Sequence, residues 1–312
     1  MGRWWSGTWI CEEVALQVFR GSGQVYLTCG FSPDGRFLAA GGIGRLVDIW
    51  DTFDPTVPGR QLPVDESSVV HLAYADDGLL TICTARQPVR VVDPLGEWPE
   101  RMVGQPNSMV ITRGVCSKDG SHILLGGDQL GVVELAGWGR EVWADDAMPG
   151  RVFAGVEYEP DGSRVAVSRV GVGYPVWSVI EIRDAACGLV LTEIPIRGQR
   201  PDKLSWSPDG RLLAGLVDKH LTVWETESWS EVFGPPEPPD GGDWLAVQFH
   251  SSGKSLLTGN ATGAITCWEV GTWKSSVTLQ WGSAPVYAFA FAPDGLRAAA
   301  AGHDRVTVWG IG

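Results

Sequence analysis

A four-residue turn that recurs seven times constrains the fold of this chain more than any other feature. The copies span residues 32–35, 75–78, 117–120, 159–162, 207–210, 250–253 and 292–295. Their closing glycines are separated by 43, 42, 42, 48, 43 and 42 residues. A period of this size is typical of repeat architectures, in which each unit packs against its neighbours. We therefore expect one repeat domain that spans residues 1–312.

The first copy of the turn, Ser32-Pro33-Asp34-Gly35, shows why these residue types suit a tight reversal. Proline sets φ at the second position, and the carboxylate of Asp34 can accept a hydrogen bond from the backbone two residues on. Gly35 can adopt the positive φ that a side chain resists. We expect the equivalent glycines to serve as structural turns in the same way: Gly78, Gly120, Gly162, Gly210, Gly253 and Gly295.

Strand-like segments flank each turn. In the first repeat an alternating apolar stretch at 25–29 precedes the turn, another at 36–40 follows it, and a third ends at 47–50. Period-2 runs broken by glycine and proline exclude helical repeats of the same length. Four short strands in about 42 residues correspond to one propeller blade. We therefore predict an all-β chain that forms a single seven-bladed β-propeller, with four antiparallel strands per blade.

The two ends of the chain suggest how such a ring closes. The last repeat reaches Trp309 at the end of its third strand. Near the N-terminus, Gly7-Thr8-Trp9 and the apolar stretch 14–19 repeat the pattern of 271–273 and 277–281, which is a fourth strand. The prediction is that an N-terminal strand at about 8–20 completes the last blade at about 284–310, which leaves few exposed sheet edges.

The strand ends complete a resemblance to a known family. Trp50-Asp51 ends the third strand of the first repeat, with Trp224-Glu225 and Trp268-Glu269 as near variants. With the recurring turns, these pairs make essentially the whole chain resemble the WD-repeat (WD40) family. Repeats two, three and four depart from it, because Val92, Leu135 and Arg183 replace the tryptophan, and the family's Gly-His dipeptide is missing before the first strands. The resemblance implies a non-catalytic protein–protein interaction scaffold and names no partner.

Composition limits the classes of partner. The formal net charge is −13, the wrong sign for binding nucleic acid or an anionic membrane. No apolar run approaches the roughly 18 residues of a membrane helix. Glu12 and Glu13 follow the short N-terminal apolar patch closely, which argues against a secretory signal and favours the cytoplasm. We expect a monomeric propeller that binds a protein or peptide, and the acidic balance raises a basic peptide as one alternative.

Catalytic and metal-binding motifs are missing from the sequence. The five histidines are scattered, and neither H-E-x-x-H nor G-x-S-x-G occurs. The six cysteines have no C-x-x-C pair, which favours buried free thiols over disulfides or metal ligands. We therefore predict a protein that is not an enzyme and has no cofactor, no metal and no catalytic residues. The alternative is a propeller enzyme or small-ligand binder whose polar groups meet in the central channel.

Two irregularities in the repeats predict a binding face. From Gly162 to the strand end at Arg183, repeat four uses 21 residues where the other repeats use 14 or 15. The surplus, 169–178, is a glycine-rich hairpin; the proline segment 234–244 follows on the same face of the ring. From these segments we predict the partner-binding residues Arg169, Tyr174, Trp177, Glu237, Asp240 and Asp243. The alternative is that both aromatic side chains fold onto the blade and that the proline segment is a spacer.

Overall fold

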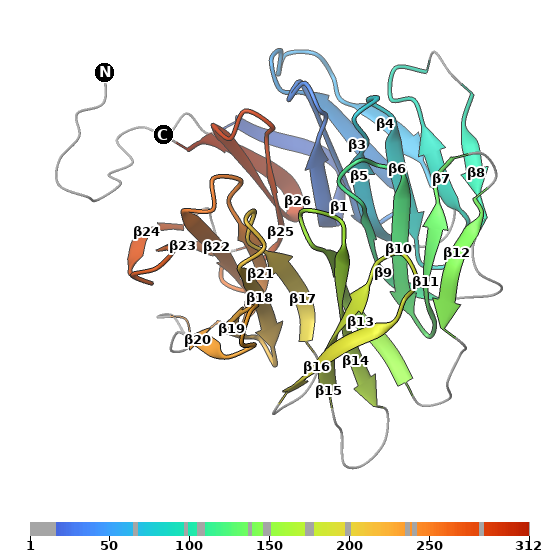
Figure 1. Cartoon of the computed structure of the whole chain (residues 1–312). Coiled ribbons are helices and arrows are strands. Elements are labelled where there is room, and N and C mark those ends of the chain that lie inside the picture. Colours follow the sequence, from blue (N-terminus) through green and yellow to red (C-terminus); the bar gives the residue numbers. More distant parts are fainter. Residues whose placement is uncertain are drawn as a thin grey trace.

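The computed structural model describes residues 17–64, 68–96, 99–104, 110–136, 139–145, 151–171, 178–196, 201–234, 238, 242–280 and 284–311. In these ranges the chain forms antiparallel β-sheets that follow one another around a ring (Figure 1). The described residues contain no helix that is long and apolar enough to cross a membrane. The prediction of an all-β propeller is therefore confirmed.

Five of the sheets have four strands each, in the order in which the strands occur along the chain. The first contains β5 (Val69–Tyr74), β6 (Leu80–Thr84), β7 (Val89–Val92) and β8 (Arg101–Val103). The second contains β9 (Ile111–Cys116), β10 (His122–Gly127), β11 (Leu130–Glu134) and β12 (Glu141–Asp145). The third contains β13 (Arg151–Tyr158), β14 (Arg164–Gly171), β15 (Ser178–Asp184) and β16 (Val190–Ile196). The fourth contains β17 (Pro201–Trp206), β18 (Leu212–Val217), β19 (His220–Glu225) and β20 (Glu231–Phe233). The fifth contains β21 (Trp244–Phe249), β22 (Ser255–Asn260), β23 (Ala264–Glu269) and β24 (Ser275–Gln280).

The sixth sheet has six strands, so the prediction of seven blades is wrong: the structure has six. Its order is β25 (Val286–Phe291), β26 (Arg297–Gly310), β1 (Gln17–Phe31), β2 (Phe37–Ile43), β3 (Leu46–Asp51) and β4 (Arg60–Pro63). The physical reason is that β1 is one strand of 15 residues shared by the first and last repeats. Its residues 17–20 pair with 305–308 of β26, and Val25 pairs with both His303 and Ile43. Residues 8–16 of the predicted N-terminal strand lie outside the described residues.

The first strands of the repeats form a closed ring at the centre. Around it β1, β5, β9, β13, β17, β21 and β25 contact one another in turn, and β25 contacts β1. In Figure 1 the red β25 and β26 accordingly lie beside the blue β1. Each of these strands contains an irregularity in its pairing with the next strand, such as the one between Tyr26 and Thr28 in β1.

The recurring turns join the first and second strands of each repeat. All seven closing glycines have positive φ, from 67° at Gly295 to 82° at Gly78. The Asp34 carboxylate accepts hydrogen bonds from the Ser32 hydroxyl at 2.5 Å and the Arg36 backbone N–H at 3.0 Å. These bonds hold the first turn in the geometry that its residue types favour.

Apolar side chains fill the space between neighbouring sheets. Trp50, Trp224 and Trp309 are buried and Trp268 is half-buried, each in a cluster shared with the preceding repeat. The five described cysteines are free. Cys29 and Cys83 are buried as their apolar surroundings suggest, but Cys187 is exposed because it lies in the turn between β15 and β16.

Candidate functional site

The predicted binding face is only partly within the described residues. Tyr174, Trp177, Glu237 and Asp240 lie outside them, so their roles stay predictions. Arg169 lies inside β14, where its side chain is 12% exposed and forms ion pairs with Glu181 and Glu193. Asp243 is exposed and pairs with Lys219, which follows the second strand of repeat five.

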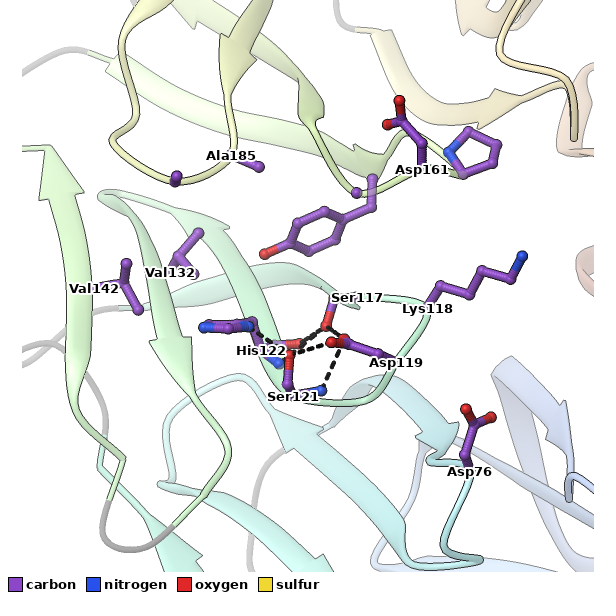
Figure 2. A pocket seen from close by; sticks show the side chains of 14 residues that line it. Asp76, Ser117, Lys118, Asp119, Ser121, His122, Val132, Val142, Asp161 and Ala185 are labelled. Atoms are coloured by element: carbon purple, nitrogen blue, oxygen red, sulfur yellow. Dashed lines mark hydrogen bonds between the residues drawn. The ribbon is translucent and has the colours of Figure 1, made fainter.

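A groove lies at the opposite end of the sheets. It has a volume of about 620 Å³ and is lined by residues of the recurring turns of repeats two, three and four together with the turn between β15 and β16. Antiparallel strands place successive connections at alternate ends, so these turns cannot lie on the face predicted from 169–178 and 234–244. We call this cavity the turn groove (Figure 2).

The turn groove lies at the junction where the strand-ending tryptophan is replaced. Arg183 ends the third strand of repeat four, at the position that Trp224 has in repeat five. Its side chain is 5% exposed, and the guanidinium binds Glu181 at 2.6 Å and Asp145 of the neighbouring sheet at 2.7 Å. Trp143 of β12 also crosses the junction, where its indole N–H donates to the Ala185 carbonyl at 2.8 Å. The junction is therefore held by polar contacts beside the groove.

One wall of the groove is a chain of hydrogen bonds (Figure 2). The hydroxyls of Ser117 and Ser121 donate to the two carboxylate oxygens of Asp119 at 2.6 and 2.7 Å. These bonds lower the pKa of Asp119 to about 2, so its carboxylate is ionised and can only accept. The Ser121 hydroxyl proton is thereby committed, and the contact of 2.6 Å between Ser121 Oγ and His122 Nδ1 requires a proton on Nδ1.

The groove combines acceptors with apolar surface. Asp76, Asp119 and Asp161 contribute carboxylates. Among the described lining residues, Lys118 is the one lysine or arginine. Val132, Val142, Tyr158, Ala185 and Ala186 line it as well. In Figure 2, Val132 and Val142 lie beyond His122, and Asp161 lies across the groove. Such a surface suits a cationic side chain that carries apolar carbon.

The serine, histidine and aspartate of this wall do not match a hydrolytic triad. In a triad the histidine accepts the serine proton and the aspartate orients the histidine. Here the Ser121 hydroxyl donates directly to Asp119, and the three residues are close neighbours in one turn. Within the described residues, moreover, no group of three or more histidine, cysteine, aspartate or glutamate side chains could hold a metal ion.

None of the groove residues Asp76, Ser121, His122 and Tyr158 is among the binding residues predicted from the sequence. The replacement of the strand-ending tryptophan by Arg183 could have predicted a groove here, because space is left where a large side chain is missing from a packed interface.

The comparisons with known proteins add one finding. Residues 14–51 match the family model described as WD40: WD domain, G-beta repeat. No curated protein matches the chain. The matched segment contains the first recurring turn and ends on Trp50-Asp51. Together with the sheets arranged around a ring, this match supports a WD-repeat β-propeller.

Proposed function

We propose that this protein is a non-catalytic interaction scaffold that binds a basic protein segment in the turn groove. WD40 propellers are typically protein-interaction scaffolds, and the groove is the observation that carries the proposal here. Its volume of about 620 Å³ falls in the range of pockets that take a few side chains of a partner.

The charges of the groove select the kind of segment. Asp76 and Asp161 are exposed, and the Asp119 carboxylate is held ionised by its serine donors. His122 and Tyr158 add ring surface to the lining. A lysine or arginine beside an apolar residue meets all of these groups, whereas an acidic segment would face three carboxylates. The net charge of −13 adds a longer-range attraction for basic partners.

The test is a selection of peptides from a random library displayed on phage. We expect the peptides selected on the wild-type protein to be enriched in lysine or arginine next to an apolar residue. Fluorescence anisotropy should show that they compete for one site and bind more weakly as salt rises. Asp76→Lys should weaken binding about tenfold, because it replaces an attraction by a repulsion.

Glu227→Lys is the matched control. Glu227 is exposed in the turn between β19 and β20, at the same end of the ring but in another sheet, and the charge reversal is the same. Binding should be nearly unchanged in this variant. Peptides without basic residues, or equal weakening by both variants, would show that the turn groove is not the binding site.

A further inference from the structure

A second cavity lies at the centre of the ring. Its volume is about 300 Å³, and residues from β1, β5, β9, β13, β17, β21 and β25 line it. Several of these residues carry charged or ionisable side chains: His71, Arg113, Glu157, Asp202 and Lys203. A channel that only needed to be filled would use apolar side chains, because an ionisable group in such a position loses hydration. We call this space the central cavity.

Two cationic side chains reach the central cavity from strands on either side of β13. Arg113 on β9 donates from Nε to the backbone carbonyl of Asp202 on β17 at 3.3 Å, and from Nη1 to the Thr112 carbonyl at 3.1 Å. Lys203 is the next residue of β17, and its ammonium makes no hydrogen bond or ion pair within the described part of the chain. The ammonium of Lys203 is close enough to Arg113 for their charges to repel.

The remaining ionisable groups favour an added negative charge. Burial raises the pKa of Glu157 to about 8, so this carboxyl is mostly protonated at pH 7 and can donate. Burial also lowers the pKa of His71 to about 4, and the buried Nε2 of this imidazole has no hydrogen-bond partner among the described groups. Asp202 also lines the cavity. With Glu157 protonated, one lining carboxylate faces two cationic side chains.

We propose that the central cavity is a binding site for a small anionic group, a phosphate or a carboxylate, held between Arg113 and Lys203. Arg113 offers a planar guanidinium and Lys203 a point charge, a pair of donors that suits an oxyanion. The Nε2 of His71 and the carboxyl of Glu157 are placed to complete its hydrogen bonds. The anion belongs either to a free small molecule or to an acidic side chain that a partner inserts. This site is separate from the turn groove and does not depend on the function proposed for it.

The proposal has a definite pH dependence. Burial and the charge of Arg113 lower the pKa of Lys203 to about 7, so a bound anion raises this pKa and draws in a proton. Binding is therefore strong below pH 7 and weakens as pH rises. Above pH 8 the ionised Glu157 weakens it further. The titratable or charged groups that line the cavity around Lys203 are Cys29, His71, Arg113, Cys116, Glu157, Asp202 and Tyr287.

The experiment is isothermal titration calorimetry with two probes at constant ionic strength: inorganic phosphate, and a short peptide with one glutamate as its single charged residue. At pH 6.5 at least one probe should bind saturably. Arg113→Met and Lys203→Met should each weaken binding at least tenfold, as expected for loss of a charge-assisted hydrogen bond. Repeating the titration at pH 8 in buffers of different ionisation enthalpy should show proton uptake. Phosphate binding alone identifies a free anion, and peptide binding alone identifies a partner's side chain.

Lys219→Met is the control, because Lys219 is 58% exposed and lies outside the central cavity. It should bind as the wild type does. Lys203→Met keeps the test decisive if Arg113→Met fails to fold, because Lys203 has no partner whose loss would disturb the ring. The proposal is overturned if neither probe binds saturably, if Lys203→Met binds as well as Lys219→Met, or if binding tightens as pH rises.

Discussion

The buried charges of repeat four provide the sharpest test of how this ring is held together. Glu181 is 2% exposed and lies between two arginines. It accepts from Arg183 Nε at 2.8 Å and Nη2 at 2.6 Å, and it also pairs with Arg169. In repeats five, six and seven the residues at the positions of Glu181 and Arg183 are threonine and tryptophan: Thr222 and Trp224, Thr266 and Trp268, Thr307 and Trp309.

The single variant Glu181→Thr should be strongly destabilised. Removing one partner of a buried ion pair costs about 3–5 kcal/mol, because it leaves the other charge buried without compensation. Both arginines retain a second partner, Asp145 at 39% exposure and Glu193 at 54% exposure. The expected cost is therefore at the low end, about 3 kcal/mol. For a chain of 312 residues that corresponds to a lowering of Tm by roughly 5 °C.

The double variant Glu181→Thr with Arg183→Trp should recover most of this loss. It removes both charges of the Glu181–Arg183 pair, leaves Arg169 paired with Glu193, and recreates the residues found in repeats five to seven. Replacing a buried ion pair by apolar residues is often neutral or stabilising, so we expect a free energy of unfolding within about 1 kcal/mol of the wild type. Thermal unfolding followed by circular dichroism, at one scan rate for all variants, gives the comparison.

Glu181→Thr with Arg183→Met controls for the size of the tryptophan, because methionine removes the charge without adding an aromatic ring. If both double variants are as unstable as Glu181→Thr alone, the loss does not come from the uncompensated charge of Arg183. If Glu181→Thr has the same Tm as the wild type, the ion pairs contribute nothing measurable to stability. The polar junction then does not replace the packing of the tryptophan in repeat four.

Three further predictions concern other parts of the ring. Tyr26→Phe should cost about 2 kcal/mol, because the buried Tyr26 hydroxyl donates to the Asp48 carboxylate at 2.6 Å; urea unfolding measures it. Phe19→Ala should cost about 3 kcal/mol, because Phe19 is 5% exposed beside β26, whereas Val18→Ala at 47% exposure should cost under about 1 kcal/mol in the same assay. Cys187→Ser should remove one rapidly reacting thiol equivalent from the native protein in a thiol titration, since Cys187 is exposed.

The period of the turn predicted the strands well, but it did not predict the number of sheets. A turn signature marks where the chain reverses, and Gly35 and Gly295 both adopt the positive φ that the reversal requires. Sheet membership depends on whether pairing continues between repeats, which no local signature reports. Gly21-Ser22-Gly23 resembles a break in the sequence, yet β1 runs through it from Gln17 to Phe31 and joins the last repeat to the first.

The two cavities could be predicted only in part, and for different reasons. The turn groove forms where no large aromatic side chain packs between the sheets. The sequence shows that Arg183 replaces the tryptophan, but it does not show on which side of the junction a groove forms. The central cavity could be inferred in part from the sequence. His71, Arg113 and Lys203 each lie seven positions before a turn glycine, whereas an inner strand that is only apolar would have no ionisable residue there. The sequence could not show that these side chains meet, because they come from three different strands of the ring.

Both candidate sites draw on the same part of the ring, and this has a structural cost. The turn groove needs a junction without a large aromatic filler, and the central cavity needs ionisable side chains on β5, β9, β13 and β17. Each choice gives up apolar packing that would otherwise stabilise the fold. The compensation lies elsewhere: tryptophans pack in repeats five, six, seven and one, and β1 joins the first and last repeats by backbone hydrogen bonds, which do not depend on those side chains. The closure of the ring therefore does not depend on the side chains of repeats two to four, which depart from the tryptophan pattern.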